Sequence, residues 1–215
     1  MRTRSMIGRS RLRCGRRVVL VALAILVLGP SPAAAYRQGE ASRFIAGLGT
    51  EAIRMLRATK GRLADREAAL RRILTKDFDI AFIGRFVLGR YWRALTPAQR
   101  NAYLEAFGGY VLRTYSVRLG GYAGETLVVL GERPAGKKDV VVTTRIDRPS
   151  GPPTRVEWRV RTVGGPLRIV DVAVEAVSLV ITQRAEFASV IERHGFTALV
   201  AMLRARAAPL PAVSG

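Results

Sequence analysis

The sequence predicts an α+β domain in which helices pack on a twisted, four-stranded antiparallel sheet. Three observations predict this fold. Apolar residues recur every three or four positions from residue 40 to 119, they alternate with polar residues from 125 to 176, and helical spacing returns from 178 to 205. Short turns rich in glycine and proline separate the alternating segments, which is typical of an antiparallel meander. Such a sheet needs an apolar cover, and the helices supply it.

The first 35 residues have the order of a cleavable export signal. Seven arginines and no acidic residue precede or flank an apolar run at 18–28, and Ala33-Ala34-Ala35 supplies small residues at a peptidase site. A short membrane anchor is the alternative, but the run is too short to span a bilayer. We therefore expect residues 1–35 to be a signal peptide. Arg16 and Arg17 also allow a twin-arginine signal, although the general secretory route fits better.

The chain that remains is basic and long enough for one domain. It keeps 29 basic residues against 16 acidic ones, a net charge of about +13. We expect a single domain over residues 36–206, helical at 36–122, a sheet at 125–176 and helices at 178–205, followed by a tail at 207–215. Cys14 lies in the signal, so no disulfide is expected and the hydrophobic core must hold the domain together.

Four helices are expected before the sheet. Apolar spacing places them at 40–58, 65–75, 80–88 and 97–119. Asp79 is a suitable N-cap for the third helix, and Gly89 is suitable at its C-terminal end. The fourth helix begins with Thr96-Pro97-Ala98-Gln99, a capping box with proline in the first turn.

The strands are expected at 127–130, 139–147, 155–163 and 167–176, with turns at 134–136, 149–153 and 164–166. The third strand alternates most clearly, with Val156, Trp158 and Val160 facing the helices. Helices at 178–192 and 196–205 follow. His194 precedes Gly195 at the break between them, where a cation suits the helix end.

Residues that could carry catalysis are few. One histidine and one cysteine exclude a Cys/His zinc site, and no nucleotide-binding motif or nucleophile elbow occurs. We expect Asp171 and Glu175 to pair with Arg159 or Arg161 across the strands rather than act as bases. The Asp77-Phe78-Asp79 segment is expected to cap a helix rather than hold a metal. No enzyme activity is predicted.

The positive charge has two open interpretations. It is either an ordinary solvated surface or a means of attraction to anionic lipid or acidic partner surfaces, worth about 1 kcal/mol per basic residue near a membrane. Arg90 and Arg93 are the nearest candidates for docking because they flank Tyr91 and Trp92. Nucleic acid is not expected as a partner, because no basic helix face with interleaved aromatic residues occurs.

Several segments resemble the MlaC family of periplasmic phospholipid-binding proteins, also known as toluene-tolerance auxiliary transport components. The Leu88-Gly89-Arg90-Tyr91-Trp92 segment followed by the Gln99-Arg100 helix start is the most specific. The resemblance covers nearly the whole mature chain and is carried by residues 78–80, 87–93, 96–100, 107, 115, 119, 169–172, 175–178 and 184–187. The family usually has glycine where Ala176 stands, and often an aromatic residue near Leu167.

The resemblance implies a nuclear-transport-factor-like fold and the function of a periplasmic lipid shuttle. Such a shuttle would exchange phospholipid between an inner-membrane ABC transporter complex and an outer-membrane lipoprotein complex, with bound phospholipid as cargo and no cofactor. A monomer is expected. Three alternatives stay open: a hopanoid or other non-phospholipid cargo, an exported enzyme on the same fold, and an adaptor with a filled core.

The lipid pocket is expected between one face of the sheet and the helices. The Thr144 hydroxyl on this apolar face needs a partner, which water or a headgroup at the pocket mouth could supply. The candidate lipid-binding residues are Phe82, Phe86, Tyr91, Trp92, Phe107, Val111, Tyr115, Val142, Thr144, Val156, Trp158, Val160, Val172, Val174 and Phe187.

Overall fold

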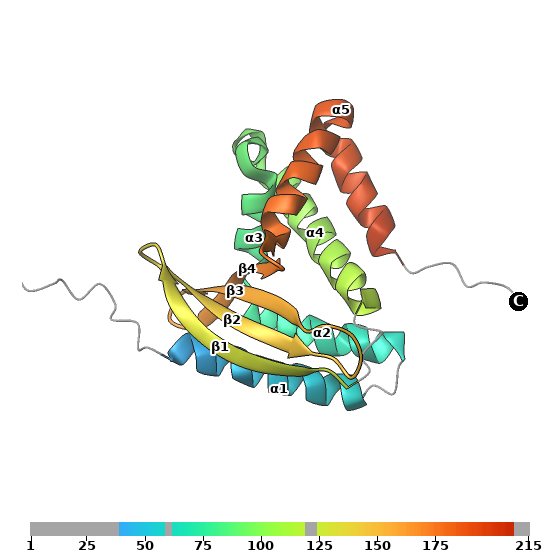
Figure 1. The fold of residues 1–215 in the computed structure, drawn as a ribbon. Helices are drawn as coiled ribbons and strands as arrows, with labels where there is room; N and C mark the ends of the chain where they lie inside the picture. Colours follow the sequence, from blue (N-terminus) through green and yellow to red (C-terminus); the bar gives the residue numbers. More distant parts are fainter. Residues whose placement is uncertain (1–38, 59–61, 119–123, 209–215) are drawn as a thin grey trace, which may run out of the picture. The chain divides into compact units, whose positions relative to one another are not determined.

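A computed structural model describes residues 39–58, 62–118 and 124–208 of the chain. The expected signal peptide and most of the expected tail lie outside the described residues. The elements in order are α1 (Glu40–Ala58), α2 (Leu63–Asp77), α3 (Ile80–Leu88), a 3-10 helix η1 (Gly89–Ala94), α4 (Pro97–Arg118), β1 (Thr126–Ala135), β2 (Asp139–Asp147), β3 (Thr154–Thr162), β4 (Leu167–Val174), β5 (Val177–Ser178) and α5 (Leu179–Ala207) (Figure 1). The expected α+β class is confirmed.

The helix starts follow the capping signals in the sequence. The Asp79 carboxylate accepts a hydrogen bond from the Phe82 amide at 2.9 Å and so caps α3. Thr96 and Gln99 form the reciprocal capping box of α4: the Gln99 amide donates to Thr96 Oγ1 at 3.2 Å, and the Thr96 amide donates to Gln99 Oε1 at 2.9 Å. Both caps were predicted from the residue types and their spacing.

The sheet is an antiparallel meander in the order β1-β2-β3-β4-β5, so it has five strands rather than four. β1 runs past the expected end at residue 130 because a bulge near Gly131 lets the pairing continue. Pro134 and Ala135 pair with Val140 and Asp139, so the expected turn at 134–136 is wrong. Proline is tolerated there because β1 is an edge strand.

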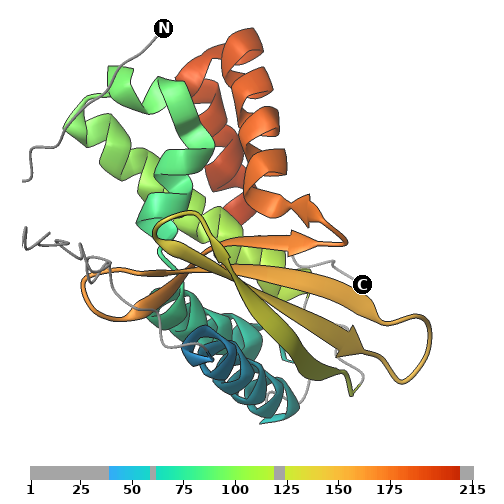
Figure 2. The same cartoon turned by 60° about the vertical axis from the view of Figure 1, so that its left-hand side comes forward.

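Two sets of helices pack on different parts of the sheet. α1 runs along one face, where Ala41, Ile45 and Leu48 join Val142 and Val160 in a buried cluster. α3, α4 and α5 gather beyond β4 and form a second cluster among themselves, centred on the fully buried Tyr103, Phe107 and Phe187. The two views show α1 and α2 on one side of the sheet and α3, α4 and α5 on the other (Figure 2).

α5 is two helical segments joined at a break. Gly195 has φ 82° and ψ 167°, which are not helical angles, and glycine adopts such a positive φ at little cost. This break matches the sequence expectation of two helices with His194 at the end of the first. Figure 1 shows the second segment turning back beside α4.

The β4–β5 connection is a two-residue turn made by Glu175 and Ala176, both with positive φ, 48° and 65°. This turn ends β4 at Val174, two residues earlier than expected. The expected pairing of Glu175 with Arg159 or Arg161 is wrong, because the turn points its carboxylate at the Arg155 amide, which donates to it at 2.7 Å.

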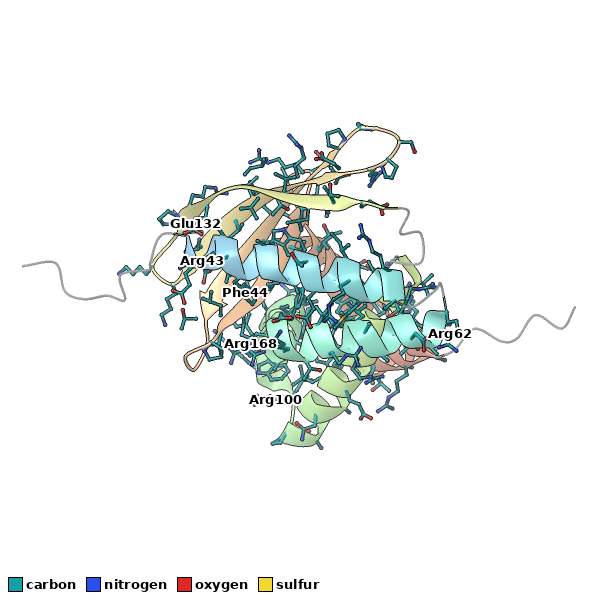
Figure 3. All side chains as sticks on the ribbon, turned by 90° about the horizontal axis from the view of Figure 1, so that it is seen from below. Arg43, Phe44, Arg62, Arg100, Glu132 and Arg168 are labelled. Carbon is teal, nitrogen blue, oxygen red and sulfur yellow. The ribbon has the colours of Figure 1, made fainter. Side chains whose placement is uncertain are left out.

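A side chain from the sheet holds the start of α1. The Glu132 carboxylate accepts hydrogen bonds from the amides of Gly39 at 2.6 Å and Ser42 at 2.7 Å. Burial alone would raise the pKa of Glu132, but these hydrogen bonds, helped by the nearby Arg43 guanidinium, hold the pKa below its ordinary value. Figure 3 shows Glu132 and Arg43 together at this end of α1. The carboxylate fixes α1 against β1 at the helix end where negative charge is most favourable.

We expect Glu132→Gln to lower the free energy of unfolding at neutral pH by about 1 kcal/mol, the usual value of such a cap. A depressed folded-state pKa stabilises the protein above the unfolded pKa and stops doing so as pH falls through the folded value. Urea unfolding at pH 7 and pH 3 should therefore show a gap between wild type and variant that closes in acid. Glu105→Gln, on the exposed side of α4, should show no gap at either pH.

Ala176→Gly should stabilise the protein by about 0.5–1 kcal/mol, because a left-handed conformation strains alanine by about 1–2 kcal/mol and does not strain glycine. Thermal unfolding is the measurement. The matched control, Ala173→Gly in extended β4, should instead destabilise by about the same amount. A less stable Ala176→Gly variant would show that the turn is not strained.

Candidate functional site

An apolar cavity of about 280 Å³ lies where both sets of helices meet the end of the sheet. It is partly open to solvent. Its walls come from α1, α2, α3, α4, β3, β4 and the first two turns of α5. The lining residues are Leu48, Ala52, Leu70, Ile73, Leu74, Phe78, Ile80, Ile83, Val87, Phe107, Tyr110, Val111, Tyr115, Trp158, Asp171, Val172, Leu179, Val180 and Gln183.

The polar groups of the cavity wall are already hydrogen-bonded within the protein. Asp171 accepts from the Ser178 hydroxyl at 2.7 Å and from the Val180 amide at 3.3 Å. Gln183 Oε1 accepts from the Tyr110 hydroxyl at 3.0 Å. These bonds leave an apolar surface, and no nucleophile and base lie together among the described lining residues. Such a surface suits an apolar guest rather than a reacting one.

The expected pairing of Asp171 with Arg159 or Arg161 is wrong. Both arginines instead reach the buried carboxylate of Asp139, Arg159 at 3.2 Å and Arg161 at 2.6 Å. Asp171 lies opposite Arg159 in the β3–β4 register, but β5 and the start of α5 pass beside it and supply closer donors. A carboxylate at a helix N-terminus is favourable in itself.

Five of the candidate lipid-binding residues line the cavity: Phe107, Val111, Tyr115, Trp158 and Val172. The structure brings these together from α4, β3 and β4. The remaining ten are not among its lining residues. The sequence analysis did not identify the part of the cavity wall that comes from α1 and α2. The apolar spacing indicated which side of each helix faces inward, but it could not show whether that side borders a cavity or filled core.

The sheet candidates outside the wall belong to the packed core or its margin. Val142 and Val160 have no exposed surface and pack against α1, and Val156 is 3% exposed. Val174 is half-buried and pairs with Val156. Most of this face of the sheet is packed core, because α1 lies on it and the register shifts at a bulge between β3 and β4. Only the end of the face with Trp158 and Val172 borders the cavity.

The Thr144 hydroxyl has its partners inside the protein, not at a pocket mouth as expected. It donates to the Val156 carbonyl at 3.2 Å and accepts from Trp158 Nε1 at 2.9 Å, and Thr144 has no exposed surface. The hydroxyl therefore orients the indole ring that forms part of the cavity wall.

The helical candidates outside the wall divide into core and surface. Phe187 is fully buried between Phe107 and Tyr110, and Trp92 packs edge-on against Tyr103. The Tyr91 hydroxyl donates to Glu192 at 3.0 Å. Arg90, a docking candidate, is paired with the same carboxylate.

Phe82 and Phe86 lie on the outer side of α3. The inner side of this helix is taken by the buried Ile83 and Val87, so residues at 82 and 86 turn outward. The two rings stack 6.2 Å apart, and the guanidinium of Arg161 lies 4.5 Å from the Phe82 centroid. Arg85 also lies over the Phe82 ring, and Arg184 lies over the Phe86 ring.

No three His, Cys, Asp or Glu side chains within the described ranges are grouped so that they could hold a metal ion. Among the helices of those ranges, none is both long enough and apolar enough to cross a membrane.

A sheet and helices that enclose an apolar cavity, with its polar groups satisfied, define a binding protein for an apolar ligand. The chain belongs to the MlaC family: the family described as "MlaC protein" matches residues 48–205. The phospholipid-binding protein from Ralstonia solanacearum, solved in complex with a phospholipid, has the same fold, with a TM-score of 0.65. It is 24% identical, and the match covers 75% of this chain and 96% of that one.

Thr144→Val should lower the free energy of unfolding by about 1–2 kcal/mol, because the indole N–H of Trp158 would lose its acceptor in a partly buried place. Thr144→Ser keeps the hydroxyl and should cost less. Denaturant unfolding followed by tryptophan fluorescence measures both. Equal stability of the valine variant and wild type would mean that water replaces the hydroxyl.

Proposed function

We propose that this protein is a periplasmic carrier that binds a phospholipid with its acyl chains in the apolar cavity. The observation that carries the proposal is the cavity itself, open to solvent yet walled by apolar side chains whose polar neighbours are hydrogen-bonded. Membership of the MlaC family supports it, as does the phospholipid bound to the Ralstonia solanacearum protein of the same fold.

The energetics require such a cavity. Each methylene moved from an apolar environment into water costs about 0.8 kcal/mol, so two chains of roughly fifteen methylenes would cost on the order of 20 kcal/mol. A protein that takes a phospholipid out of a membrane must offset most of this with apolar surface of its own. The cavity walls supply that surface without a catalytic group.

The partners follow from the same proposal. A carrier needs a donor and an acceptor, and family membership supports an inner-membrane ABC transporter complex and an outer-membrane lipoprotein complex. The arginine-rich leader supports export to the periplasm with residues 1–35 removed. The exported chain's excess of basic residues favours contact with anionic lipid or acidic protein surfaces.

Ala52→Phe should reduce bound lipid without unfolding the protein. Ala52 is half-buried and lines the cavity from α1. A cavity of about 150 Å³ holds one benzene ring, so an added ring would take roughly half of the space. We expect the amount of phospholipid that co-purifies from the periplasm, measured by mass spectrometry against protein, to fall by about half or more.

The matched control is Ala46→Phe, on the exposed side of the same helix. It should load as much lipid as wild type, and both variants should unfold at temperatures close to that of wild type. Wild-type protein that carries no lipid would refute the proposal. A polycyclic lipid in the extract would change the proposed cargo but leave the proposed carrier function in place.

A further inference from the structure

A second hollow adjoins the apolar cavity. Its volume is about 510 Å³, and Leu74, Phe78 and Ile80 line both spaces. These three side chains, from the end of α2 and the start of α3, therefore lie at the boundary where the two spaces meet. α4 supplies the opposite wall of the hollow through Gly108 and the buried Leu112.

The hollow differs from the cavity in charge. Its lining includes Arg71 and Arg168, whereas the cavity lining contains, among the described residues, one charged residue, the acid Asp171. Among the residues that the structure describes, the one acid that lines the hollow is Asp79, and its carboxylate caps α3. The hollow is thus lined by two cationic residues, Arg71 and Arg168, and by one carboxylate, that of Asp79, which is already hydrogen-bonded.

The two arginines are held differently. Arg168 donates to the Thr75 carbonyl at 3.2 Å, in the last turn of α2, and Figure 3 shows it at that end of the helix. This bond uses one of its several N–H groups. Arg71 is exposed on α2 and makes no ion pair with any residue of the described ranges. Its guanidinium is available to an anion.

A phospholipid needs both environments within one molecule's length. Its chains require the apolar cavity, where a phosphate would meet the Asp171 carboxylate and no cationic side chain of the described lining. Guanidinium groups match the geometry of phosphate oxygens and bind them through paired hydrogen bonds. The adjacent hollow supplies such residues, Arg71 and Arg168, and it borders the cavity at Leu74, Phe78 and Ile80.

We propose that this hollow is the subsite for the phosphate of the lipid, with Arg71 as its main contact and Arg168 as a second one. The proposal rests on the function proposed above and adds to it a preference: cargo with a phosphate next to its chains is held more tightly than cargo of the same chains without one.

The first test compares two fluorescent lipids with identical acyl chains, a phosphatidylglycerol and a diacylglycerol. Arg71→Gln should weaken phosphatidylglycerol binding about tenfold, the loss expected for one charge-assisted contact, and leave diacylglycerol binding unchanged. The control is Arg72→Gln, which removes a neighbouring exposed arginine of α2 that does not line the hollow. It should leave both affinities unchanged.

The second test fills the hollow from the opposite wall. A Cβ placed on Gly108 meets no atom within 4 Å, and this helical glycine has no positive φ, so Gly108→Leu should fold. It should weaken phosphatidylglycerol binding more than diacylglycerol binding. Gly47→Leu is the control, since Gly47 is an exposed helical glycine of α1 with the same open surroundings and lines neither space.

The outcomes separate the two proposals. If wild type binds neither lipid, the carrier function and the subsite both fail. If it binds both lipids and Arg71→Gln binds phosphatidylglycerol as wild type does, only the subsite fails. Inorganic phosphate serves as the last probe: binding to lipid-free protein that depends on Arg71 but does not compete with phosphatidylglycerol would identify a free-phosphate site and overturn the proposal.

Discussion

The short connection between α2 and α3 is the constraint on which the rest of the domain depends. The Asp79 amide donates to the Ile169 carbonyl of β4 at 3.0 Å, while the Asp79 carboxylate caps α3. One residue earlier, Phe78 packs against both buried clusters described above and against a third, formed by Leu70 and Leu74 of α2 with Leu112 of α4. A backbone hydrogen bond, a helix cap and an aromatic ring thus tie the α1–sheet core to the α3–α4–α5 core at one place. Because Asp79 both caps α3 and donates its amide hydrogen bond to Ile169, the direction of α3 is fixed relative to β4.

The cavity is a consequence of this arrangement. Each core is well packed by itself. Val142 and Val160 are fully buried in the α1–sheet core, and Tyr103 and Phe187 are fully buried in the α3–α4–α5 core. The two layers meet between α2 and α4, at the Phe78 junction and along the start of α5, and side chains from both border a space that neither fills. The cavity walls are therefore apolar side chains that have no other side chain packed against them on the cavity side. Empty apolar space of this kind costs stability, of the order of 24 cal/mol per Å³, and a bound apolar guest recovers that loss.

Sequence patterns could predict the elements and some of the cavity wall, but not the direction of every side chain. The caps at Asp79 and Thr96 and the break at Gly195 were predictable because they depend on local backbone chemistry. Phe82 and Phe86 were placed inward because they are apolar, and periodicity alone cannot show that Ile83 and Val87 occupy the inner side. The partners of Asp171 could not be found either, since β5 and the register shift that surround it follow from tertiary packing. The same holds for the wall from α1 and α2.

The size of the cavity bears on how a lipid could enter. If about 150 Å³ holds the six carbons of benzene, 280 Å³ holds roughly eleven carbons, less than one full acyl chain. A two-chain lipid therefore requires the walls to separate. The junction at Asp79 resists separation there, because opening it would break the bond to Ile169 and expose the cap. The walls farther from it, from α1 and α4, are joined to α2 by side-chain ion pairs: Lys76 pairs with Glu51, and Arg113 pairs with Glu67. Expansion away from the α2–α3 connection therefore breaks side-chain bonds rather than the backbone bond to Ile169.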